Sequence, residues 1–382
     1  MASILALNSG SSSVKYAVFD SELDVLAKGQ VENIGAGLTP RATSGGNEMP
    51  LPPGLSSHAD IIPLLIEELI LPTAGELAGV GHRVVHGGTR FDQPIVIDNI
   101  IRRQIAELAP LAPSHQPHNL AGIDAVSAIL PEVTQVACFD TAFHRTIPEY
   151  RQLMELPQRF AEEGLRRFGF HGLSYAGIVG TLPAIAGEAA GGRVVACHLG
   201  NGCSLAGIVD GRSQYTSMGF TPLDGLVMGR RPGRLDPGAV LWLVEKHGGD
   251  AKAVDRLFNQ EAGLLGVSGI SSDMRTLLES DEPSAKLAIA MFVDRLVQEI
   301  GAAVAAIGGI DVLVFTGGIG ENAAPVRAMT VEALGFLGFE LDVEANAANA
   351  PAISRPGAGP SIHVVPADEE GTIVQCVKRL VA

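Results

Sequence analysis

An arginine and an aspartate mark points where this sequence could contact a ligand. Arg83 lies near the end of the apolar stretch 78–85, where a buried guanidinium is costly unless an anion pairs with it. Its planar fork suits a carboxylate or a phosphate, although Arg83 alone could equally form a structural salt bridge. Asp140 follows the apolar stretch 133–139, and carboxylates at strand ends face the ligand crevice in open α/β folds. Asp also favours helix N-caps, but the next residues have no strong helical pattern, so we interpret Asp140 as functional.

A loop rich in glycine and proline, residues 228–234, carries Arg230, Arg231 and Arg234 in a chain with a formal net charge of −15. The loop could be a solvated basic surface. Alternatively, one arginine could stabilise charge on a transferring phosphoryl group. Glu369, which follows another apolar stretch, could hold Mg²⁺ directly or through water, because Mg²⁺ binds few carboxylates plus phosphate oxygens.

One pattern occurs twice, over residues 4–20 and 194–210. Each copy is an apolar stretch, a turn of small residues and a second apolar stretch that ends in Asp. The pattern predicts a β-hairpin whose turn exposes backbone N–H groups. Two such hairpins predict two related domains that hold a phosphate chain between their turns, with Lys15 adding a positive charge.

Three histidines lie in or beside turns. His115, His171 and His198 neighbour Gly or Pro, where functional residues concentrate, although a lone histidine is more often structural. Their spacing fits no common metal-ligand pattern, and the four cysteines form no CxxC pair, so we expect no zinc site and reduced thiols in a cytoplasmic protein.

Strands alternate with helices along the chain, which predicts an α/β fold. The apolar stretch 310–316 runs into a glycine-rich turn at 317–322, an arrangement typical of nucleotide contacts. Residues 35–57 are predicted as a loop. A strand at 361–366 and a final helix from 371 complete the chain. That helix is expected to pack on the first domain, giving domains of residues 1–145 plus 368–382 and of residues 146–367.

Composition excludes several classes of partner. The chain of 382 residues has 46% hydrophobic and 18% charged residues, as globular proteins do. Its acidity argues against non-specific binding to nucleic acid or to anionic membranes. The longest apolar stretch, 287–307, carries charged residues at helical spacing and is predicted as a packed helix rather than a membrane span.

Nine motifs together resemble those of the acetate, propionate and butyrate kinase family, within the actin–hexokinase–Hsp70-like ATPases. In chain order they are LNSGSSSVKY, GHRVVHGG, FDTAFH, RRFGFHG, HLGNG, TSMGFTPLDGL, SSDMR, FTGGIGEN and the terminal DEE. The resemblance implies two duplicated ribonuclease H-like, actin-like ATPase domains with a cleft between them. It also implies reversible, Mg²⁺- or Mn²⁺-dependent transfer of a phosphoryl group from ATP to acetate, giving acetyl phosphate and ADP, in a homodimer.

The resemblance also implies roles for individual residues. The N-terminal domain would bind the acyl group and the metal ion, and the C-terminal domain would bind the nucleotide and form the dimer contact. Catalytic roles would fall to Arg83, Asp140, His171 and Arg231, and metal ligation to Asn8 and Glu369. Substrate would contact Arg83, Val85, Ser114, His115, Phe170 and Pro222. The nucleotide would contact Lys15, His198, Leu199, Gly200, Asn201, Gly202, Asp273, Met274, Arg275, Gly318, Ile319, Gly320, Glu321 and Asn322.

Ser114 departs from the family pattern, which commonly has Leu there to line the acyl pocket. A smaller, more polar residue could enlarge the pocket, and one methylene of fit is worth only about 1–3 kcal/mol. Propionate or butyrate kinase is therefore the near alternative. A sugar kinase or exopolyphosphatase of the same superfamily would lack the arginine pair of Arg83 and Arg231, and an Hsp70-like module would need a peptide-binding domain.

Overall fold

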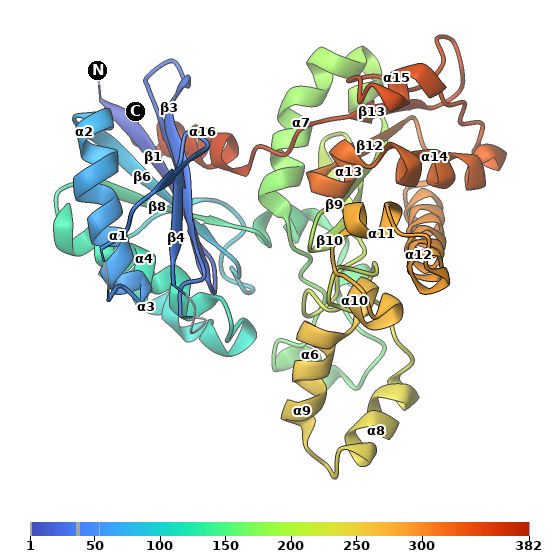
Figure 1. Ribbon diagram of the computed structural model, residues 1–382, viewed down its shortest axis with the longest axis horizontal. Helices are drawn as coiled ribbons and strands as arrows, with labels where there is room; N and C mark the ends of the chain where they lie inside the picture. Colours follow the sequence, from blue (N-terminus) through green and yellow to red (C-terminus); the bar gives the residue numbers. More distant parts are fainter. Residues whose placement is uncertain (1, 36–38, 53, 382) are drawn as a thin grey trace. The chain divides into compact units, whose positions relative to one another are not determined.

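The computed structural model describes residues 2–35, 39–52 and 54–381, which form two compact units (Figure 1). One comprises residues 1–143 with 368–382, and the other comprises residues 144–367. Both are built from a β-sheet and helices, so the predicted α/β class is confirmed. The ends of the predicted domains, Met1 and Ala382, lie outside the described residues.

The first unit contains an eight-stranded sheet in the order β5-β4-β3-β2-β1-β6-β8-β7. Strands β1, β2 and β3 form an antiparallel meander, whereas β6 pairs parallel to β1 and β8 parallel to β6. The bounds are β1 Ser3–Ser9, β2 Ser13–Phe19, β3 Val25–Glu32, β4 Arg41–Ser44, β5 Asn47–Met49, β6 Leu77–Val84, β7 Ile95–Val96 and β8 Thr134–Phe139.

Helices cover both faces of this sheet. Leu5, Leu7 and Val80 pack in one buried cluster with residues of α1, and Val84 packs with residues of α4. The opposite face takes α16, because Gly79 and Gly81 leave room for its side chains. The helical bounds are α1 His58–Leu65, η1 Ile66–Ile70, α2 Leu71–Ala74, α3 Asn99–Glu107, η2 Ala109–Leu111, α4 Gln116–Ile129 and α16 Glu369–Val381.

The second unit repeats the strand order of the first. Its five-stranded sheet runs β11-β10-β9-β12-β13, with an antiparallel meander followed by two parallel strands, as in β3-β2-β1-β6-β8. The sequence repeat thus corresponds to the hairpins β1–β2 and β9–β10. The bounds are β9 Arg193–Leu199, β10 Cys203–Val209, β11 Arg212–Thr216, β12 Val312–Thr316 and β13 Ser361–Val364.

Helix α12, Pro283–Ile307, packs on β9, β10 and β11 of this second sheet. Eight of its apolar side chains are buried, including Phe292, Leu296 and Ile300. The other helices are η3 Ala142–Thr146, α5 Glu149–Gln152, α6 Gln158–Glu162, α7 Gly172–Ala186, η4 Gly187–Gly191, α8 Pro237–Lys246, α9 Ala251–Arg256, η5 Leu257–Glu261, α10 Gly263–Ser268, α11 Met274–Leu278, α13 Gly317–Asn322, α14 Ala324–Ala333, η6 Gly335–Leu337 and α15 Val343–Ala347.

Two local predictions were wrong. Residues 35–57 are not simply a loop, because they contain the edge hairpin of β4 and β5; residues 36–38 and 53 lie outside the described part. The final helix begins at Glu369 rather than at residue 371. None of the helices in the described ranges is long and apolar enough to cross a membrane.

Candidate active site

The first unit brings Arg83 and Asp140 into a two-point ion pair. The Nη2 of Arg83 donates to Asp140 Oδ2 at 2.6 Å, and its Nε lies 3.0 and 3.1 Å from the two carboxylate oxygens. Asp140 is 1% exposed. A guanidinium held at two points by a carboxylate has a fixed orientation, so Asp140 fixes the direction in which Arg83 points.

Strand register explains why these residues meet. Residues of one parity share a face of a strand, and Gly79, Gly81 and Arg83 of β6 face α16. Asn8 at the end of β1 accepts a hydrogen bond from Arg83 Nη1 at 3.3 Å. Glu369 begins α16, and its Oε2 lies 3.8 Å from Arg83 Nε. Three strand ends and one helix end therefore supply the cluster of Asn8, Arg83, Asp140 and Glu369.

Opposing electrostatic effects act on this cluster. Burial raises the pKa of Asp140 above its ordinary value, and the positive charge of Arg83 limits the rise. Burial alone would lower the pKa of Arg83, but Asp140 and Glu369 reverse that effect, so its pKa is raised and the guanidinium stays charged. The cluster therefore contains one positively charged side chain, Arg83, surrounded by the carboxylates of Asp140, Glu369 and Glu370.

Asn8 and Glu369 present the oxygen donors that Mg²⁺ prefers. The side chain of Glu369 is 17% exposed, so its carboxylate is open to a ligand as well as lying near Arg83. The donor chemistry of the two residues therefore fits the predicted ion. Among the described residues, no group of three or more His, Cys, Asp or Glu side chains could hold a metal, so a protein-only metal cage of that kind is not built there.

Three more of the predicted substrate residues, Val85, Ser114 and His115, lie just after β6 and at the start of α4. Val85 is 7% exposed and directly follows β6. His115 is the N-cap residue of α4, and Ser114 precedes it with its side chain exposed. Lys15 is exposed on β2 and pairs with Asn8 in the hairpin.

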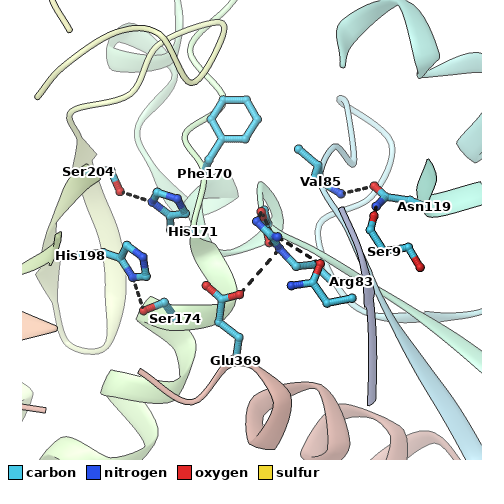
Figure 2. A network of polar contacts seen from close by, with 12 residues as sticks. Ser9, Arg83, Val85, Asn119, Phe170, His171, Ser174, His198, Ser204 and Glu369 are labelled. Carbon is cyan, nitrogen blue, oxygen red and sulfur yellow. Dashed lines mark hydrogen bonds and ion pairs between the residues drawn. The ribbon is translucent and has the colours of Figure 1, made fainter. Parts of the chain in front are cut away.

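Two stacked histidines mark the second unit. The rings of His171 and His198 lie 4.3 Å apart, centre to centre, with planes 26° apart. A serine hydroxyl contacts each ring: Ser204 Oγ lies 2.9 Å from His171 Nδ1, and Ser174 Oγ lies 2.9 Å from His198 Nδ1 (Figure 2). His171 adopts a left-handed conformation, with φ of 58°, directly before α7. Non-glycine residues rarely take this conformation, and strain of this kind concentrates at functional sites.

The turn between β9 and β10 is packed against the arginine loop. Gly229 N donates to Asn201 O at 3.2 Å, and a side chain on Gly229 would meet Asn201 Oδ1 at 2.3 Å. Ser272 O, at 3.0 Å from the same position, adds a backbone contact, so a side chain at Gly229 would have little room. The predicted phosphate-binding turn, Gly200–Gly202, therefore lies beside the segment that carries Arg231.

Arg231 is partly buried, and its neighbour Arg230 is exposed. Across the residues that the structure describes, Arg231 has no ion-pair or side-chain hydrogen-bond partner. Burial lowers its pKa because desolvation disfavours the charged form. A half-buried guanidinium that lacks an ion-pair partner would be stabilised by a bound anion.

Helix α13 begins where β12 ends, beside the end of β9. Gly317 approaches so closely that a side chain there would meet Leu199 O at 2.8 Å. The carboxylate of Glu321 accepts from Gly317 N and from Ala367 N, each at 2.9 Å. Glu321 thus joins α13 to the segment that follows β13. Gly318 and Asn322 are exposed, and Gly320 is buried.

The remaining predicted nucleotide residues have mixed environments. Asp273 is the N-cap of α11 and accepts from Thr276 N at 3.4 Å, while Arg275 is exposed. Met274 and Leu199 are buried in the core at 2% and 0% exposed, so only their main chains can reach a ligand. Phe170 and Pro222, which are predicted to contact the substrate rather than the nucleotide, are 3% exposed and half-buried respectively.

Several residues that contact the predicted site side chains or their strands were missed by the sequence analysis. Ser174, Ser204 and Asn119 contact a site residue or its strand, yet none stands in a chemical motif. A signal existed for the serines. Ser204 pairs with His198 across the β9–β10 hairpin, and Ser174 lies three residues after His171, so sequence and register place each serine near one histidine, although it contacts the other.

Comparison with known proteins identifies the family. Residues 3–375 match the acetokinase family model. An acetate kinase from Rhodopseudomonas palustris (strain TIE-1) is 46% identical, covering 99% of this chain and 98% of that relative. The crystal structure of Porphyromonas gingivalis acetate kinase has a TM-score of 0.92 at 36% identity, with 100% of both chains covered. A propionate kinase structure from Francisella tularensis subsp. tularensis SCHU S4 has a TM-score of 0.93 at 35% identity, covering 98% and 99%.

Acetate kinases have the duplicated actin-like ATPase fold, and the repeated strand order of the two sheets follows it. The predicted fold is therefore confirmed. By sequence and by structure, the chain belongs to the acetokinase family.

Proposed function

We propose that this chain is an acetate kinase, a phosphotransferase with a carboxyl group as acceptor. It moves the terminal phosphoryl group of ATP directly and in line to acetate, giving acetyl phosphate and ADP, and it also runs the reaction in reverse. Family membership supports the reaction class. The arrangement of charge in each unit supports the assignment of residues.

The acceptor needs no general base, because a carboxyl group with a pKa near 4 is already ionised at neutral pH. The difficulty is that two anions must approach each other. Arginines reduce that repulsion and hold the reactants in line. We assign Arg83 to the acetate carboxylate and Arg231 to the transferring phosphoryl group. Asp140 is a positioning residue that orients Arg83 through its two-point contact.

The observation that carries the proposal is the half-buried, unpartnered guanidinium of Arg231. Its desolvation is unfavourable in the free protein and is offset when an anion binds. A phosphoryl group that gains charge in the transition state is the ligand that this residue would stabilise most strongly. Gly229 holds the loop against the Gly200–Gly202 turn. The N–H of Gly200 donates to Gly202 O at 3.0 Å, so the N–H groups of Asn201 and Gly202 would bind ATP phosphates.

The proposal includes Mg²⁺ as cofactor, held by Asn8 and Glu369. When bound, Mg²⁺ neutralises charge on the phosphate oxygens and links them to the protein. The oxygen donors of both residues fit this ion, and Mn²⁺ would use the same ligands. Lys15, on the strand paired with β1, adds a positive charge for the phosphates.

The nucleotide is assigned to the second unit. We propose that His171 stabilises the transition state and that His198 contacts the phosphates, with Ser204 and Ser174 orienting their rings. The N-terminal ends of α11 and α13, through Asp273–Arg275 and Gly318–Asn322, would hold adenosine and the phosphates. The acyl group would contact Val85, Ser114, His115, Phe170 and Pro222.

Replacing Arg231 tests the proposal, and Arg230 is the matched control. Acyl phosphate formed from ATP and acetate is trapped with hydroxylamine. Arg231→Ala should lower kcat by roughly a hundredfold, since charge-stabilising donors contribute about that much. Arg230→Ala removes the same charge from an exposed neighbour and should stay close to wild type. Wild-type kcat in Arg231→Ala, or no trapped product from any short-chain acid, would overturn the proposal.

We further propose that the protein works as a homodimer in the cytoplasm. The second unit exposes apolar side chains on two helices, Leu241 and Trp242 on α8 and Leu287 and Met291 on α12. Exposed apolar surface of this kind is typical of a contact between subunits. The mass of the protein in solution, measured by light scattering, tests the stoichiometry.

A further inference from the structure

The buried side chain of Asn119 joins the ends of two strands that carry proposed site residues. Asn119 lies on α4 and is 2% exposed. Its Nδ2 donates to Ser9 O at 2.7 Å, and its Oδ1 accepts from Val85 N at 3.0 Å (Figure 2). Because Ser9 O can only accept and Val85 N can only donate, the orientation of the amide is settled.

The amide lies where the two strands stop pairing. The parallel ladder between β1 and β6 ends at the pair Leu7 and His82. Beyond it, Ser9 and Val85 are held through Asn119, which acts as an inserted peptide unit with one donor and one acceptor. The proposed metal ligand Asn8 directly precedes Ser9, and the proposed acetate-binding Arg83 lies two residues before Val85, so the separation of Asn8 and Arg83 depends on this bridge.

Helix α4 is seated directly on the end of β1. A side chain on Gly122, which follows Asn119 by three residues, would meet Ser9 Oγ at 2.5 Å. Gln116, three residues before Asn119, donates from Nε2 to His86 O at 3.1 Å and so holds the segment after β6. One face of α4 therefore contacts the ends of both β1 and β6.

We infer that Asn119 is a positioning residue for the acceptor, because it sets the distance between Asn8 and the pair Arg83 and Val85. The inference rests on the proposed roles of Asn8 and Arg83. A loss of the bridge should act on the acetate side of the reaction. We therefore expect a higher KM for acetate and a lower kcat, with KM for ATP nearly unchanged.

Asn119→Asp gives a test that a merely structural role would not satisfy. An ionised carboxylate keeps the acceptor for Val85 N but cannot donate to Ser9 O, which it repels. The protonated acid has a carbonyl oxygen and a hydroxyl and restores both contacts. Since burial raises the pKa of such a carboxyl, protonation should occur within the accessible pH range.

The measured quantity is kcat/KM for acetate of the variant divided by that of the wild type at the same pH. We expect a loss of roughly tenfold or more at pH 8, which corresponds to about 1.4 kcal/mol, and recovery toward one as pH falls to 5.5. A ratio near one at every pH, or a loss that does not change with pH, would overturn the inference.

Gln135→Glu is the matched control. Gln135 is also a buried amide of the first unit, but it lies at the start of β8, where it contacts His82 and Ser127 at 2.8 Å. The same amide-to-acid change there should reduce the denaturant midpoint and leave KM for acetate close to wild type. Equal acetate-specific losses in both variants would mean that Asn119 acts only through stability.

Two further variants separate the outcomes. If Asn119→Asp does not fold at pH 8, the uncharged Asn119→Ala is compared for KM of acetate against KM of ATP, and equal changes in the two would overturn the inference. Arg83→Ala tests the underlying assignment. Wild-type activity in Arg83→Ala would remove the proposed acceptor site, whereas an inactive Arg83→Ala with a wild-type Asn119→Asp would remove only the role of Asn119.

Discussion

Ser114 is the proposed acyl-pocket residue that departs from the family pattern, which commonly has Leu at this position. Its side chain is exposed and directly precedes His115, the N-cap of α4. A short hydroxyl leaves room that a larger acyl chain could fill, and each methylene of fit is worth about 1–3 kcal/mol. Acetate and propionate kinases both occur among the relatives of this chain.

We expect Ser114→Leu to narrow the range of acids. The added side chain should lower kcat/KM for propionate relative to acetate by roughly tenfold or more. Competition between the two acids in the hydroxylamine assay measures this ratio directly. Ser114→Ala removes the hydroxyl without adding bulk and should leave the ratio unchanged. If Ser114→Leu also leaves it unchanged, Ser114 does not line the acyl pocket.

The sequence predicts which residues belong to the site better than it predicts which of them contact each other. Arg83 and Asp140 were each singled out from the end of an apolar stretch, but their two-point contact depends on the register of β6 with β8. No local pattern encodes that register. Asn119 escaped prediction for the same reason, because its partners Ser9 and Val85 come from strands distant in sequence.

At the scale of elements, one carboxylate connects the start of α13 to the segment that follows β13. Glu321 accepts from Gly317 N at the start of its own helix and from Ala367 N, just before the chain enters α16. Hydrogen bonds to a charged group contribute about 1.5–3 kcal/mol each. Glu321 therefore positions the helix by internal contacts, and its main chain rather than its carboxylate is the part available to a nucleotide.

Removing this carboxylate should affect the nucleotide. We expect Glu321→Ala to raise KM for ATP by several-fold to tenfold and to leave KM for acetate within twofold, because only the start of α13 loosens. Glu321→Gln keeps an acceptor oxygen at the same place and should recover most of the affinity. Steady-state kinetics with each substrate varied in turn would check this. A larger KM change for acetate than for ATP would contradict it.

The edge hairpin shows where prediction of elements failed. The Gly, Pro and Ser residues clustered in 35–57 predict a loop, yet this stretch contains β4 and β5. Gly45 and Gly46 both have positive φ, at 56° and 83°, as a two-residue hairpin turn requires. A Gly-Gly pair between extended residues was the available signal, and polar composition outweighed it because an edge strand need not bury apolar side chains.

At the scale of the whole molecule, buried histidines connect stability to pH. Burial lowers the pKa of His82, His86 and His144 to about 4. In the unfolded chain a histidine has a pKa near 6.5, so below that value the unfolded state binds more protons. The free energy of unfolding should therefore fall as pH drops from about 6.5 toward 4, by up to about 1.4 kcal/mol per pH unit for each histidine.

Denaturant midpoints between pH 7.5 and 5 would show this dependence. His82→Gln replaces a buried histidine that contacts Gln135 at 2.8 Å with a group that does not titrate, so its midpoint should fall less steeply. The absolute stability of the variant is expected to be lower at pH 7.5, and only the slope is diagnostic. Equal slopes for variant and wild type would exclude His82 as a source of acid sensitivity.

The packing of α16 on β1, β6 and β8 has a consequence for synthesis on the ribosome. Residues 144–367 leave the exit tunnel before α16 does, and they form a compact unit of their own. The nascent first unit meanwhile lacks the side chains of Ile373 and Val377 that cover Gly79 and Gly81, and it lacks Glu369. We therefore expect the second unit to mature first, and the sheet that holds Arg83 to remain a client for chaperones until translation reaches α16.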